Sequence, residues 1–306
     1  MIYIEMLIQS LFDMMTDPNA RWVLIGCTLL GLSSGVVGSF AYLRRQSLMG
    51  DAIAHATLPG VCIAFLIVGT KSLFFFLLGA AIAGLLASYA IGFITRHSKI
   101  KQDSALGVVL SVFFGVGIVL LTFIQQSGNG NQSGLDHFLF GHAASMVVTD
   151  VWTMVVVSVA LVVICTALFK EFKIVSFDVQ FTQSLGYPVA VLDHLLMSLI
   201  VVTVVIGIQA VGVVLIVALL IIPAVSARYW TDRLHVMVIV SSGFGAISGF
   251  VGTYISTLDN NLPTGPLCVL VGAVIFVISL LFAPRRGVVA KQWLRSTLRK
   301  KIQQVS

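Results

Sequence analysis

The stretch LFFFLLGAAIAGLLASYAIGFIT, residues 73–95, decides the fold, because it runs without a single charged side chain. A helix needs about 20 predominantly apolar residues to cross the hydrocarbon core of a bilayer. The stretch is long enough to do so, and it therefore predicts a membrane-spanning helix.

Blocks of this kind recur along almost the whole chain. Apolar residues make up 58% of the 306 positions and charged residues only 10%. A soluble fold of this length could not hide so much apolar surface in a core. We therefore predict an all-α polytopic membrane protein with eight or nine transmembrane helices. The predicted spans are 21–43, 47–69, 73–95, 104–125, 150–169, 191–208, 210–227, 235–256 and 267–283. Fusing the two spans that meet at Gly207–Gly212 would leave eight.

The basic residues predict the orientation. If nine spans alternate, all Lys and Arg except Arg21 and Lys71 fall on one side of the membrane. Lys and Arg are enriched in cytoplasmic loops. The N-terminus is therefore predicted outside and the C-terminus in the cytoplasm. Because the basic residues form short clusters between apolar blocks, the net charge of +6 does not indicate a nucleic-acid partner.

The predicted spans and orientation divide the chain into three segments. Residues 1–18 are predicted to be an interfacial segment, residues 19–284 the transmembrane domain, and residues 285–306 a basic cytoplasmic tail. Four cysteines lie singly inside apolar blocks and are interpreted as small buried hydrophobes. These are Cys27, Cys62, Cys165 and Cys268.

Asp51 is the one acidic residue well inside a predicted span, and His55 follows it by four residues. A charged side chain within a span costs roughly 2.5–3.5 kcal/mol on insertion scales, so it needs a use or a partner. Positions i and i+4 share one helix face. The carboxylate and the imidazole could therefore bind one divalent cation, or simply contact each other near the headgroups. Two ligands are too few for a specific site, but a two-fold homodimer would supply four.

Two further groups of acidic and histidine side chains are weaker metal candidates. Asp136, His137 and His142 lie in the outer loop 125–149 and could load cations from outside. Asp193 and His194 begin the sixth predicted span, where solvation of the helix end is the favoured interpretation.

The cytoplasmic stretch IVSFDVQFTQSLGYPV, residues 174–189, is predicted to be one short amphipathic helix with a Gly stop and a following Pro. Phe177, Phe181 and Leu185 recur at four-residue steps and form an apolar stripe. The stripe could dock on a cytoplasmic partner or lie on the membrane surface.

The chain contains no GxxxxGK[ST] phosphate-binding loop, so any ATP-driven activity requires a separate ATPase. A stand-alone secondary transporter is the main rival, but proton coupling would need more intramembrane acids than Asp51. A membrane-embedded protease would show HExxH or an intramembrane serine nucleophile with a base, and neither pattern is present.

Several motifs, in order along residues 20–284, resemble the permease subunits of the ABC-3 family of metal importers. The matching stretches are GDAIAHATLPGV (50–61), KQDSALGVVLSVFFGVGIVL (101–120), FDVQFTQSLGYPV (177–189), QAVGVVLIVALLIIPAVSARYWTDR (209–233) and LPTGPLCVLVGA (262–273).

This resemblance implies a homodimeric permease in a bacterial cytoplasmic membrane, with one translocation path at its centre. It implies two cytoplasmic ATP-binding-cassette ATPase subunits and an extracytoplasmic solute-binding protein as partners. Asp51 and His55 match the family's metal-coordinating pair. The residues that match its ATPase-docking loop are Phe177, Asp178, Phe181, Leu185 and Gly186.

The metal is the transported substrate, and no permanently bound cofactor is expected. A carboxylate–imidazole set without thiolate suits manganese, which accepts hard oxygen ligands and six-coordination. Zinc and iron remain alternatives, because the manganese and zinc branches share these motifs and affinity alone favours zinc. Overall the chain looks closest to the manganese branch.

Overall fold

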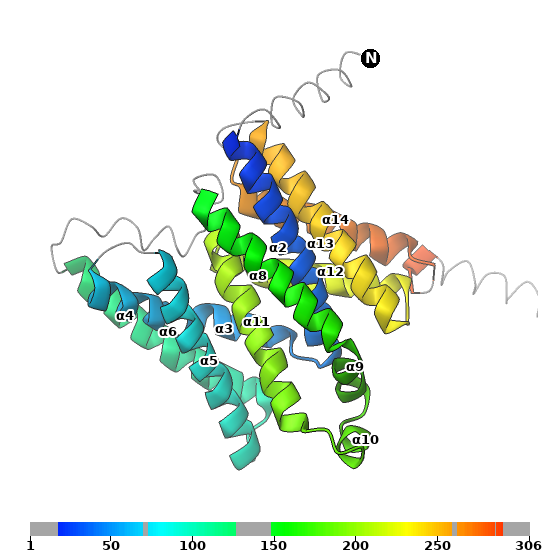
Figure 1. Cartoon of the computed structure of the whole chain (residues 1–306), viewed down its shortest axis with the longest axis horizontal. Helices are drawn as coiled ribbons and strands as arrows, with labels where there is room; N and C mark the ends of the chain where they lie inside the picture. The colour runs from blue at the N-terminus through cyan, green and yellow to red at the C-terminus, as the bar shows by residue number, and fades with distance from the viewer. Residues whose placement is uncertain (1–17, 70–72, 127–147, 259–261, 285, 290–306) are drawn as a thin grey trace, which may run out of the picture.

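The structure, a computed structural model of the whole chain, describes residues 18–69, 73–126, 148–258, 262–284 and 286–289. Within these ranges every regular element is a helix, as predicted (Figure 1). In chain order the helices are α2 (Pro18–Leu43), α3 (Ser47–Ala56), α4 (Leu58–Val68), α5 (Leu73–His97), α6 (Gln102–Gln126), α8 (Val148–Ala167), α9 (Phe169–Phe177), α10 (Val179–Ser184), α11 (Val189–Val211), α12 (Val213–Trp230), α13 (Leu234–Thr257) and α14 (Thr264–Phe282).

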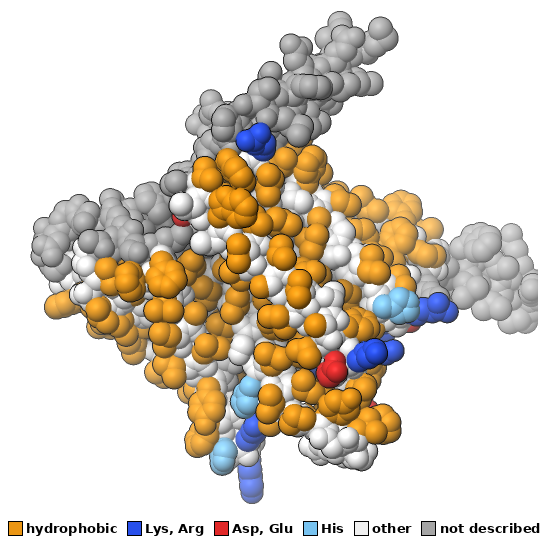
Figure 2. Space-filling model, viewed as in Figure 1, with side chains coloured by type: hydrophobic (Ala, Val, Ile, Leu, Met, Phe, Trp, Pro, Cys, Tyr) orange, Lys and Arg blue, Asp and Glu red, His pale blue; other side chains and the backbone are white. Residues whose placement is uncertain are grey.

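Eight helical segments of the described chain are long and apolar enough to cross a membrane. They are α2, the α3–α4 pair, α5, α6, α8, α11, α13 and α14; α12 is a shorter apolar helix. Figure 2 shows hydrophobic side chains over most of the visible face, with few charged side chains among them. Such a surface is stable against lipid rather than water. The chain is therefore a multi-pass membrane protein, as the sequence predicted.

A glycine separates α11 from α12. Gly212 has φ 90° and ψ 165°, a conformation that residues with a Cβ rarely adopt, and α12 begins directly after it. The two apolar segments predicted to meet at 207–212 are therefore two helices and not one. The break lies a few residues later than the predicted boundary, because α11 continues to Val211.

The span predicted over 47–69 forms as two short helices. Thr57 lies between α3 and α4, and Pro59 stands at the first turn of α4. Proline has no N–H to donate and its ring crowds the carbonyl four residues earlier, which here belongs to His55. The hydroxyl of Thr57 donates to the carbonyl of Ala54 at 2.7 Å. The backbone irregularity therefore lies directly after the candidate metal pair.

Helix α2 lies in the middle of the bundle and packs most extensively against α13 (Figure 1). A Cβ on Gly31 would overlap the carbonyl oxygen of Gly245, and a Cβ on Gly245 would overlap that of Gly31. The hydroxyl of Ser241 donates to the carbonyl of Gly35 at 2.8 Å across the same contact. Small residues let membrane helices approach this closely. All four cysteines are buried, as predicted.

Candidate functional site

Asp51 and His55 lie one turn apart on α3. The Nε2 atom of His55 is 3.7 Å from the Oδ1 atom of Asp51, too far for a hydrogen bond. A transition-metal ion with two ligand bonds of about 2.1 Å can bridge a separation of up to roughly 4 Å. The spacing leaves room for an ion between the two side chains, and it is also within ion-pair distance for a charged imidazole.

The pair faces outward from the chain. Its side chains are 29% exposed for His55 and 48% exposed for Asp51, whereas Ala52, Ile53 and Ala56 on the same helix are fully buried or nearly so. The buried face of α3 packs against α5, α6, α11 and α12. The bundle therefore anchors α3 and leaves the carboxylate and the imidazole accessible.

An aromatic contact orients the imidazole. The ring of Phe114 on α6 lies edge-on to His55, with 5.2 Å between centroids and 80° between planes.

Among the described residues, no group of three or more His, Cys, Asp or Glu side chains could hold a metal ion. One copy of the described chain therefore offers at most two side-chain ligands at this position, and a metal ion bound here would need further ligands from elsewhere.

An apolar groove runs beside α4, and neither Asp51 nor His55 lines it. Pro59, Ile63 and Ile67 follow His55 at four-residue steps and line this groove, which has a volume of about 450 Å³ between α4, α5 and α6. Its walls carry no charged side chain. An ion would lose its hydration there without gaining ligands, so the groove is not a metal site.

The predicted single helix over 174–189 is wrong. The structure ends α9 at Phe177 and starts α10 at Val179, with Asp178 in an extended conformation between them. The carboxylate of Asp178 accepts a hydrogen bond from the backbone N–H of Phe181 at 2.9 Å, which caps the start of α10. Gly186, at φ 82°, ends the segment as predicted.

The apolar stripe of this segment is on the surface. Phe177, Phe181 and Leu185 are 62%, 53% and 51% exposed. Two residues that the sequence reasoning did not include, Val179 and Tyr187, are each 40% exposed beside them. Helices α9 and α10 lie beside the start of α11, at one end of the bundle (Figure 1). We call these five side chains the docking stripe, after the role predicted for this segment from the sequence.

The remaining predicted residues divide into two groups. Asp136, His137 and His142 lie outside the described residues. Asp193 and His194 are on α11. The prediction that solvation of the helix end explains Asp193 is wrong, because its carboxylate pairs with the guanidinium of Arg44. His194 instead lies near the ring of Tyr89, with 6.2 Å between centroids.

Comparison with known proteins points to a transport family. A family model described as the ABC 3 transport family matches residues 16–283. The manganese transport system membrane protein MntC of Bacillus subtilis is 54% identical over 293 residues, which cover 96% of this chain and 67% of that protein. The zinc transport system membrane protein TroC of Treponema pallidum is 43% identical, over 94% of this chain and 96% of that protein.

A solved structure shares the fold as well. The structure titled "PsaBC from Streptococcus pneumoniae in complex with Fab" has a TM-score of 0.79 and 36% sequence identity, and the match covers 91% of this chain and 96% of that chain. The family match spans most of the chain, including the helices that carry Asp51, His55 and the docking stripe. The chain belongs to the ABC 3 transport family.

Proposed function

We propose that this chain is the membrane-spanning permease subunit of an ATP-driven importer of a divalent transition metal, with manganese as the favoured substrate. One observation carries the proposal: a carboxylate and an imidazole share the open face of a transmembrane helix at a separation that fits a bound cation. The membership of the chain in the ABC 3 transport family supports a transport role for this pair.

The two-ligand geometry supports a homodimer. Two copies related by a two-fold axis beside α3 would bring two carboxylates and two imidazoles to one ion. The exposed apolar side chains Ile63 and Ile67 on the same face of α4 give the second copy a surface to pack against. Such an arrangement would place one translocation path on the dimer axis, lined by both copies of Asp51 and His55.

The choice of metal rests on the ligand chemistry and on the relatives. Oxygen and imidazole ligands without thiolate suit manganese, and the relative with 54% identity is named for manganese transport. Zinc is the second candidate, because TroC, at 43% identity, is named for zinc transport. Iron is the third. The metal is cargo, and we propose no permanently bound cofactor.

The partners follow from the chain's chemistry and family. The chain has no phosphate-binding loop, so two cytoplasmic ATP-binding-cassette ATPase subunits would hydrolyse ATP and bind the docking stripe. An extracytoplasmic solute-binding protein would deliver the metal on the opposite side. In this arrangement the N-terminus would lie outside, residues 19–284 in the bacterial cytoplasmic membrane and the tail 285–306 in the cytoplasm.

The test is reconstitution in proteoliposomes with the ATPase and the metal-loaded binding protein. We expect manganese uptake that requires ATP, the ATPase subunit and the binding protein, and competition by zinc and iron(II) then ranks the metals. Uphill manganese uptake by the permease alone, driven by a proton gradient, would instead establish the secondary-transporter alternative.

A further inference from the structure

The turn that leads into α3 is fixed by hydrogen bonds to the end of α2. The backbone N–H groups of Arg44, Arg45 and Gln46 donate to carbonyls in the last turn of α2, at 2.9–3.1 Å. The N–H of Met49, in the first turn of α3, donates to the carbonyl of Gln46 at 3.0 Å. Movement of the end of α2 is therefore passed directly to α3, which carries Asp51 seven positions after Arg44.

The side chain of Arg44 connects this turn to two other elements. Its Nη1 atom donates to the carbonyl of Val175 on α9 at 2.8 Å, and its Nη2 atom pairs with the Asp193 carboxylate on α11. The side chains of Arg44 and Asp193 are only 12% and 22% exposed. A guanidinium can bond two partners at fixed angles, whereas a lysine ammonium is a point charge on a flexible stem.

Aromatic packing holds α9 to the same end of α2. Phe40, one turn before Arg44, is fully buried and lies 6.0 Å from the ring of Phe169 and 5.5 Å from the ring of Phe172. Helix α9 ends at Phe177, the first member of the docking stripe. A continuous set of contacts therefore joins the docking stripe to α2, and through the turn to the metal-binding face of α3.

We infer that Arg44, held by Asp193, is the positioning residue through which movement of the docking stripe is transmitted to Asp51 and His55. This inference rests on the proposed function. It assigns Arg44 no contact with the metal or with the ATPase. When the ATPase moves α9, the Val175 carbonyl moves the guanidinium that Asp193 holds, and the turn of Arg44 carries α3 with it.

The experiment measures metal ions imported per ATP hydrolysed, by the full complex in proteoliposomes. The variants are Arg44→Gln, Asp193→Asn and the double variant. Changes along coupling networks typically amount to 0.5–2 kcal/mol, so we expect this ratio to fall by about 2- to 30-fold in each single variant. All three variants remove the same ion pair. The double variant should therefore lower the ratio of metal imported to ATP hydrolysed no further than the more impaired single variant does.

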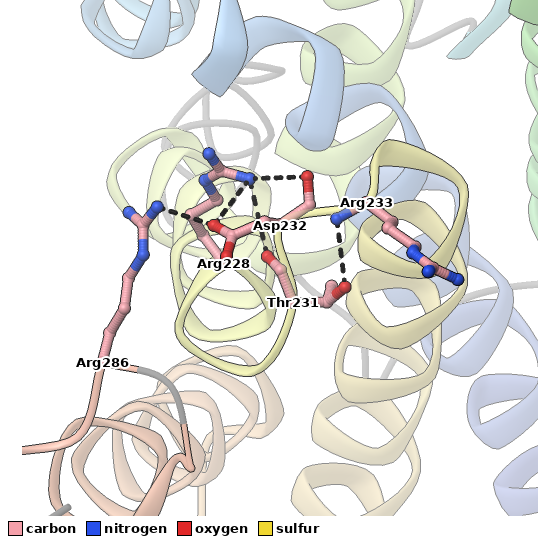
Figure 3. Close-up of polar contacts among 5 residues, drawn as sticks. All are labelled: Arg228, Thr231, Asp232, Arg233 and Arg286. Carbon is pink, nitrogen blue, oxygen red and sulfur yellow. Dashed lines mark hydrogen bonds and ion pairs between the residues drawn. The ribbon is translucent and has the colours of Figure 1, made fainter.

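A matched control exists elsewhere in the described chain. The guanidinium of Arg286 pairs with Asp232 at 2.7 Å, and Arg228 reaches the same carboxylate at 3.6 Å (Figure 3). This cluster joins the α12–α13 turn to the residues after α14 and includes no residue of α3 or α9. The side chains of Arg286 and Asp232 are nearly half exposed. We expect Arg286→Gln to leave the transport ratio unchanged.

Three outcomes separate the possibilities. A reduced ratio in the Arg44 and Asp193 variants, with complex assembly and manganese affinity retained, supports the inference. An unchanged ratio in Asp193→Asn, the milder substitution, overturns it even if Arg44→Gln fails to fold. A wild-type complex that shows no ATP-dependent manganese uptake would refute the proposed function itself, independently of the variants.

Discussion

The exposed ring of Phe181 allows a quantitative prediction about ATPase docking. A phenylalanine buries about 150–250 Å² in a full contact, and 53% of this side chain is exposed, so a partner can cover about 100 Å² more. At about 25 cal/mol per Å² this burial contributes about 2.5 kcal/mol. Phe181→Ala should therefore weaken binding of each ATPase subunit by up to roughly 70-fold.

The assay is the binding of labelled ATPase subunit to the purified permease in nanodiscs. Phe123→Ala is the matched control, because that ring is 63% exposed but lies on α6, close to the end of that helix at Gln126. We expect the control to bind the ATPase like the wild type. Phe181→Asp should abolish binding, because it would bury an unpaired carboxylate. Wild-type affinity in Phe181→Ala and Phe181→Asp would refute the docking role of the stripe.

Three further predictions follow from the sequence and packing. The purified chain alone should hydrolyse no ATP, because it has no phosphate-binding loop; turnover by the chain free of any partner would contradict the subunit assignment. Gly245→Ala should lower the thermal unfolding temperature, because its Cβ would overlap the carbonyl of Gly31 at a typical cost of about 1–3 kcal/mol, whereas Gly243→Ala, which meets no atom, should not. Asp178→Ala should weaken ATPase binding severalfold, because it removes a helix cap worth about 1 kcal/mol. Asp178→Asn can still cap α10 and should bind the ATPase normally. An equal loss of binding in both variants would assign the effect to the charge of Asp178.

Much of the fold is predictable because lipid imposes simple rules on a sequence. Apolar blocks of about 20 residues predict the spans, and most boundaries differ from the structure by no more than three residues. The helix ends at Gly186 and near Gly212 are also predictable from the sequence, because few residues other than glycine adopt positive φ. The break at Asp178 was missed, although an aspartate three residues before Phe181 is a common capping signal.

The candidate site was only partly predictable. The i, i+4 spacing correctly placed Asp51 and His55 on one face of α3, because helix geometry alone decides this. The pairing of Arg44 with Asp193 joins residues 149 positions apart, and no local pattern reports such a contact. The ring of Phe114 beside His55 comes from another helix and was equally invisible in the sequence.

The central claim is that Asp51 and His55 bind the transported cation, and manganese uptake by the Asp51→Asn complex tests it most directly. Asparagine keeps the size and much of the hydrogen bonding but removes the negative charge that offsets desolvation of the ion. Because loss of even a supporting group typically costs 10–100-fold, we expect the initial uptake rate to fall by more than about 100-fold at unchanged protein level in the membrane. An Asp51→Asn complex that imports manganese at the wild-type rate would contradict the account and direct the search to Asp136, His137 and His142.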